Sequence, residues 1–243
     1  IYLNRKSHIV AINPKKFILD RHITFLIFKI GFPSIIQQSL VSVGNAFITT
    51  FVNTFGATAI AAFGAAGRID AVAFMPAMSL GMAVSALTGQ NLGAEKPERV
   101  KEIFKWGVIM TSAITLAISA FAAGMPRLLL SMFLNDPAVI EIGVTYLRIV
   151  GSFYILFAIM FISSGIINGA GHTITTMIFT LVSLWVIRVP LSAILSKTPL
   201  GLTGIWISIV VSFGVTMVIS LVYYSSGRWK KSVIRKRPSV SKA

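Results

Sequence analysis

The chain has 243 residues, of which 55% are hydrophobic and 12% are charged, and its formal net charge is +15. So much apolar surface exceeds what one soluble core can bury, which excludes an ordinary soluble enzyme or binding domain. The basic residues lie at the ends of apolar runs and are not interleaved with stacking aromatics, so we expect no nucleic acid partner. Cysteine is absent, which excludes disulfide and thiol chemistry.

The chain opens with a polar, basic segment over residues 1–29, which begins with Ile1 and shows no cleavable signal. We interpret it as a cytoplasmic connector from a segment upstream, and expect the chain to be the second half of a longer protein. Apolar runs follow, each near the roughly 20 residues that a helix needs to cross a bilayer, and none alternates as a barrel strand does. The predicted spans lie near 30–52, 58–87, 106–125, 140–165, 173–195 and 202–224. We therefore predict an all-α membrane protein with six transmembrane helices and a basic cytoplasmic tail over 225–243.

Positive charge is sorted between the two sides of these spans. One side carries the basic residues of the leader, of the connector between spans two and three, and of the tail, whereas the other carries only Arg127 and Lys197. Basic residues mark the cytoplasmic side of a membrane protein. We expect a multi-pass protein of the bacterial cytoplasmic (inner) membrane, with both ends of this segment in the cytoplasm.

Span one contains Pro33, which we place in the first helical turn, and three side-chain amides, Gln37, Gln38 and Asn45. Amides are costly when they face lipid, so they should point toward neighbouring helices or a wet cavity. Hydrogen bonding between helices and contact with a ligand both remain open.

Span two carries Asp70, the only acidic residue away from the ends of the predicted spans. An intramembrane carboxylate is a candidate ligand for a proton or cation, and the alternative is a structural ion pair with an arginine. Arg68 is two residues away and points in another direction on a regular helix, whereas Arg148 or Arg188 could reach Asp70 from other helices. For all three arginines, snorkelling or interhelical pairing is the favoured role.

Met75 and Met78 recur at helical spacing in span two, where packing is the more common role but flexible thioethers also suit a promiscuous apolar surface. The connector over 93–102 mixes Glu with Lys and Arg, and we predict a salt-bridged surface helix under the membrane. We find no metal-ligand, nucleophile or phosphate-loop motif, so we expect neither an enzyme nor a metal or cofactor.

Several segments, in order and at their spacing relative to the six spans, resemble the carboxyl-terminal half of a multidrug and toxic compound extrusion (MATE) transporter. The resemblance covers nearly the whole chain. Its segments are Gly31 to Gln38, Met75 to Gly81, Gly89 to Ala94, Gly169 to Thr173, Trp185 to Leu191 and Gly201 to Trp206.

The resemblance implies one lobe of a transporter with two six-helix lobes, which exchanges small organic, mostly cationic drugs for Na⁺ or H⁺ across the membrane. The implied partners are therefore the lipid bilayer, a drug substrate and an amino-terminal six-helix lobe that this chain does not contain. Many relatives carry an essential acid in the first helix of that other lobe. Some relatives also carry acids in the carboxyl-terminal lobe, but span one here has Gln37 and Gln38 and no acid, so we expect coupling to reside mostly upstream.

From helix position and polarity, we expect spans one, two and four to line the cavity. The candidate lining residues are Gln37, Gln38, Asn45, Asp70, Met75, Met78 and Tyr154. Two alternatives remain: a flippase for lipid-linked saccharides in the same superfamily, which would need several cations facing a phosphate, and a membrane scaffold that transports nothing. An intramembrane enzyme is the weakest interpretation because no catalytic constellation is present.

Overall fold

The structure is a computed structural model that describes residues 21–230. Within this range it contains helices and no strand, and six helical segments are long and apolar enough to cross a membrane, which confirms the predicted fold class. The elements are α1 (Arg21–Asn53), α2 (Ala57–Gly93), α3 (Pro97–Gly124), α4 (Pro126–Ser131), α5 (Pro137–Val150), η3 (Gly151–Phe153), α6 (Tyr154–Gly169), α7 (Thr173–Leu181), η4 (Val182–Arg188), α8 (Val189–Leu195), α9 (Gly201–Ser225) and η5 (Arg228–Lys230).

The first span begins earlier than we predicted. Residues 21–29, which we assigned to the connector, are the first turns of α1, because the apolar residues 25–28 extend the span toward the amino terminus. Pro33 consequently lies inside α1 and not in its first turn, where it removes one intrahelical hydrogen bond. Residues 1–20 of the connector and 231–243 of the tail lie outside the described residues.

The prediction of a separate surface helix over 93–102 is wrong. The chain turns at Gly93–Lys96, and Pro97 then begins α3, which continues without a break to Gly124. Proline suits the first position of a helix, and the negative charge of Glu98 in the first turn interacts favourably with the helix dipole. Glu98 also pairs with Lys101 at 2.8 Å, so the connector is salt-bridged as expected, but as part of α3.

Two spans that we expected to be continuous are interrupted. In span four, the 3₁₀ turn η3 separates α5 from α6, and the carbonyl of Gly151 in that turn accepts a hydrogen bond of 2.5 Å from Ser119 of α3. In span five, the π-helical segment η4 lies between α7 and α8, and Pro190 follows in the first turn of α8. Proline lacks an N–H for the carbonyl four residues earlier, which accounts for a change of winding at this place.

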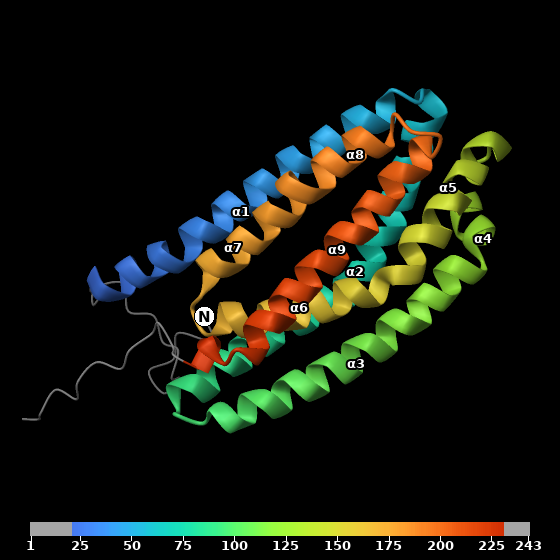
Figure 1. Cartoon of the computed structure of the whole chain (residues 1–243). Helices are drawn as coiled ribbons and strands as arrows, with labels where there is room; N and C mark the ends of the chain where they lie inside the picture. Colours follow the sequence, from blue (N-terminus) through green and yellow to red (C-terminus); the bar gives the residue numbers. More distant parts are fainter. Residues whose placement is uncertain (1–20, 231–243) are drawn as a thin grey trace, which may run out of the picture.

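The spans form two groups (Figure 1). Helix α1 lies along α7 and α8, so the first and fifth spans are neighbours although they are distant in sequence. Helices α2, α3, α6 and α9 pack as the second group, in which α6 contacts each of the other three. The short helix α4 packs beside α5.

The closest approach in the second group joins α2 to α6. A Cβ atom added to Gly165 would lie only 2.5 Å from the carbonyl oxygen of Gly81, so neither backbone leaves room for a side chain. Gly169, one turn further along α6, likewise meets the backbone of α2 at Ser85. Small residues spaced in this way allow membrane helices to pack backbone to backbone.

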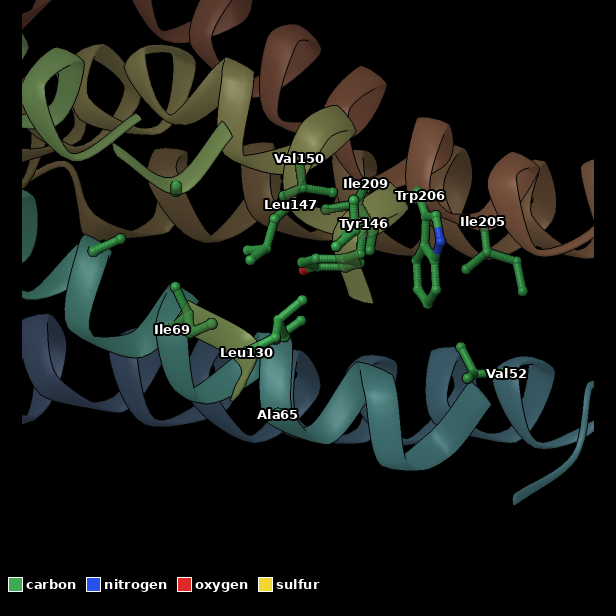
Figure 2. Packing of buried hydrophobic residues seen from close by; sticks show 14 of the residues in the cluster. Val52, Ala65, Ile69, Leu130, Tyr146, Leu147, Val150, Ile205, Trp206 and Ile209 are labelled. Atoms are coloured by element: carbon green, nitrogen blue, oxygen red, sulfur yellow. The ribbon is translucent and has the colours of Figure 1, made fainter. Parts of the chain in front are cut away.

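A cluster of buried apolar side chains lies between α2, α5 and α9, and it includes Tyr146 and Trp206 (Figure 2). In that view both side chains point toward α2, where Ala65 and Ile69 lie. Many other large apolar residues are exposed on the outside of the lobe, for example Met82 at 71%. Such a surface is suited to lipid or to a second protein lobe.

Candidate functional site

The carboxylate of Asp70 is held by two tyrosine hydroxyls from different helices. Tyr154 of α6 donates a hydrogen bond of 2.5 Å to Oδ1, and Tyr146 of α5 donates one to Oδ2. Both tyrosines are buried, with 1% and 2% of their surface exposed. Asp70 itself lies about 20 Å along α2 from its first residue, Ala57, given a rise of 1.5 Å per residue. This distance places the carboxylate within the span.

The two tyrosines lie on either side of the break in span four. They are eight residues apart, with Tyr146 in α5, Tyr154 at the first residue of α6 and the 3₁₀ turn η3 between them. Eight residues rotate an α-helix by only about 80° beyond two full turns, so residues at this spacing share one broad face. Both hydroxyls reach the same carboxylate.

Aromatic rings surround the tyrosines on the remaining sides. Tyr146 makes edge contacts with Phe63 of α2, at 5.9 Å between ring centroids, and with Trp206 of α9, at 4.7 Å. Phe74 of α2, one turn beyond Asp70, makes an edge contact of 5.2 Å with Tyr154. The carboxylate thus has its hydrogen-bond donors inside an otherwise apolar wall, where a negative charge is expensive to leave uncompensated.

The ion pair with an arginine, which we gave as the alternative role of Asp70, is not formed among the described residues. Among the described residues the ion pairs are Glu98–Lys101 and Arg127–Glu141, and neither involves Asp70. The carboxylate oxygens are taken by tyrosines instead.

Of the three arginines that we considered as partners, only Arg188 is turned into the interior. Its Nε donates a hydrogen bond of 2.6 Å to Ser212 of α9, and its guanidinium lies 4.6 Å from the ring centroid of Phe213. Arg148 is exposed on α5, and exposed Arg68 has its guanidinium 6.0 Å from the ring centroid of Phe133.

The other predicted lining residues do not gather around Asp70. Gln37 donates a hydrogen bond of 2.6 Å to Thr180 of α7, so this amide joins two helices, which was one of the two roles left open for it. Met75 and Met78 are exposed on α2, at 61% and 41%. The exposed residues Gln38 and Asn45 lie on α1. Their role as cavity lining stays a prediction.

Sequence reasoning missed Tyr146, which shares the carboxylate with Tyr154. A signal existed, because Tyr146 is the other tyrosine in span four and a phenol within an apolar span usually needs a hydrogen-bond partner. Sequence reasoning also missed Ser212, the partner of Arg188. Among the described residues no group of three or more His, Cys, Asp or Glu is placed to hold a metal ion.

Comparison with known proteins places this sequence in a family. The family model described as MatE matches residues 33–194. The "Probable multidrug resistance protein YpnP" of Bacillus subtilis is 33% identical over 205 residues, covering 84% of this chain and 46% of the relative. The "Probable multidrug resistance protein NorM" of Thermotoga maritima is 28% identical over 215 residues, covering 88% of this chain and 46% of the relative. The chain therefore spans about half the length of these curated relatives.

Solved structures show the same fold. A structure described as an outward-facing conformation of a multidrug resistance MATE family transporter superposes with a TM-score of 0.86 at 24% identity, covering 95% of this chain and 53% of that one. A MOP superfamily transporter from Pyrococcus furiosus gives a TM-score of 0.84 at 24% identity, covering 95% of this chain and 52% of that one. Because the family model matches well over half of the residues and the fold agrees, this chain belongs to the MATE family of membrane transporters.

Proposed function

We propose that this chain is the carboxyl-terminal lobe of a multidrug efflux transporter that exchanges a drug for Na⁺ or H⁺, and that Asp70 is the residue of this lobe that responds to the ion. The multidrug resistance names of the relatives and the MATE structures support efflux as the activity. A second six-helix lobe, facing this one across the cavity, completes the transporter.

The observation that carries the ion-responsive role is the pairing of Asp70 with two phenols and with no described cation. The free energy needed to bury a carboxylate within a membrane span, without a positive partner, falls when the carboxylate binds a proton or a cation. Neutralising it removes the charge that the two hydroxyls stabilise. Because those hydroxyls come from α5 and α6, binding of the ion would change the contacts of α2 with both helices. Alternating access needs contacts of this kind, which differ between the two states of the transporter.

The experiment is ethidium efflux from vesicles that contain this chain together with the amino-terminal half of the Bacillus subtilis relative, under an imposed Na⁺ or pH gradient. We expect gradient-dependent efflux from the joined protein and none from either half alone. Efflux that ignores both gradients would contradict antiport. No efflux from a correctly inserted joined protein would favour the flippase or scaffold alternatives.

The role of Asp70 is tested by Asp70→Asn in the same assay. The matched control is Asp136→Asn, an exposed carboxylate that caps α5 through the N–H of Ala138, a position where asparagine caps as well as aspartate. We expect Asp70→Asn to weaken the response to the gradient and Asp136→Asn to leave it unchanged. If both variants respond like the unmodified protein at equal protein level, Asp70 does not sense the ion.

A further inference from the structure

A groove with a volume of about 510 Å³ runs along the outside of the lobe between α2 and α3, near the turn that joins them. It is separate from the Asp70 site. Its apolar wall is formed on α2 by Leu80, Ala83, Val84 and Leu87, and on α3 by Ile103, Trp106, Gly107 and Met110. The wall follows both helices into the span, so an occupant would lie along the membrane normal.

The end of the groove nearest the turn is polar and carries both signs of charge. Arg99 and Glu102 of α3 line it from one side and Asn91 of α2 from the other. Arg99 and Glu102 lie about one helical turn apart, and neither belongs to an ion pair with another described residue. By contrast, their neighbours Glu98 and Lys101 pair with each other and do not line the groove.

The residues next to this polar end are of the kind found at a membrane interface. Trp106 is 58% exposed, and the ammonium of Lys105 lies 5.9 Å from the centroid of its ring. Tryptophan beside a basic residue is typical of the headgroup region, where an amphipathic ring has one side in lipid and one in water. From Ile103 to Met110 the apolar wall extends about 10 Å along α3, enough for part of an acyl chain.

We propose that this groove binds a phosphatidylethanolamine lipid of the leaflet at this end of the lobe. Arg99 binds the phosphate, Glu102 accepts a hydrogen bond from the primary ammonium, and one acyl chain lies along the apolar wall. Phosphatidylcholine lacks an N–H to donate to Glu102. Phosphatidylglycerol has no ammonium and would place its negative charge beside that carboxylate. The mixed charge of the groove end therefore selects this headgroup, independently of which drug or ion is transported.

The test uses the 243-residue chain in phosphatidylcholine vesicles that contain a trace of phosphatidylethanolamine with a photoactivatable acyl chain. After illumination, mass spectrometry locates the labelled peptides. We expect labelling within residues 80–110, and we expect unlabelled phosphatidylethanolamine to compete better than phosphatidylcholine or phosphatidylglycerol. Arg99→Gln and Glu102→Gln should each reduce the labelling about tenfold, as expected for the loss of a charge-assisted hydrogen bond.

Glu98→Gln and Lys101→Gln are the matched controls, because they remove the same charges from the same turns of α3 but outside the groove. They should leave the labelling unchanged. Equal competition by all three unlabelled lipids, which needs no variant, would show ordinary contact with bulk lipid and overturn the proposal. Loss of the labelling when the chain is joined to a second six-helix lobe would show that protein, and not lipid, covers the groove.

Discussion

The phenolic oxygen of Tyr154 lies 2.5 Å from a carboxylate oxygen of Asp70, and this hydrogen bond ties α6 to α2 within the membrane span. Replacing Tyr154 by Phe leaves the carboxylate with one donor in place of two. We expect Tyr154→Phe to lower the free energy of unfolding by about 1–3 kcal/mol, since the half-buried carboxylate loses one of its two hydrogen-bond donors. Thermal unfolding of the purified chain in detergent measures the loss.

The control for this change is Tyr223→Phe. Tyr223 of α9 is half-buried and its ring contacts Phe179 at 5.8 Å, but its hydroxyl makes no hydrogen bond to a described residue. The loss should also shrink when Tyr154→Phe is made in an Asp70→Asn background, because the charged acceptor is then already gone. Full additivity of the two changes would argue against a direct hydrogen bond.

The sequence predicted the number of spans and the importance of Asp70, because hydropathy and a lone intramembrane acid are local signals. It did not predict the partners of Asp70, since these depend on which helices pack together, and it did not predict the 3₁₀ turn at Gly151–Phe153, where the sequence has no proline. The π segment before Pro190 was easier to predict from the sequence, because a proline inside a span indicates altered winding. The bond from Gln37 to Thr180 required knowledge that α1 lies along α7.

The contact between α2 and α6 gives a prediction about packing. In Gly165→Ala the new Cβ would lie 2.5 Å from the backbone oxygen of Gly81, which cannot move without shifting α2. We expect a loss of about 1–3 kcal/mol in stability, as for other overpacked sites. The measurement is the unfolding of the purified chain by heat in detergent.

Gly67→Ala is the matched control on α2, where an added Cβ meets nothing within 4 Å. Alanine favours a helix over glycine by about 1 kcal/mol, so this variant should be at least as stable as the unmodified chain. A similar loss in both variants would mean that glycine matters for chain flexibility and not for the helix contact.

Arg188 gives a prediction about the contact between span five and α9. Lysine would keep the charge but lose the Nε hydrogen bond to Ser212 and most of the contact with Phe213. We expect Arg188→Lys to lower stability by about 2 kcal/mol. The exposed Arg148→Lys on α5 should change stability by less than about 0.5 kcal/mol. Chemical denaturation of both variants distinguishes an anchored arginine from a snorkelling one, for which the two losses would be equal.

Trp229 holds the short segment after α9 against the lobe. Only 1% of its surface is exposed, its Nε1 donates a hydrogen bond of 2.8 Å to the carbonyl of Tyr224, and Tyr224 in turn stacks on Phe104 of α3 at 4.0 Å. Removing a buried aromatic ring costs about 3–5 kcal/mol, so in Trp229→Ala we expect trypsin to cleave after Arg228 at least about tenfold faster. The exposed Trp106→Ala serves as the control. If mass spectrometry finds the same rate of cleavage after Arg228 in both variants, the packing of Trp229 does not hold this segment in place.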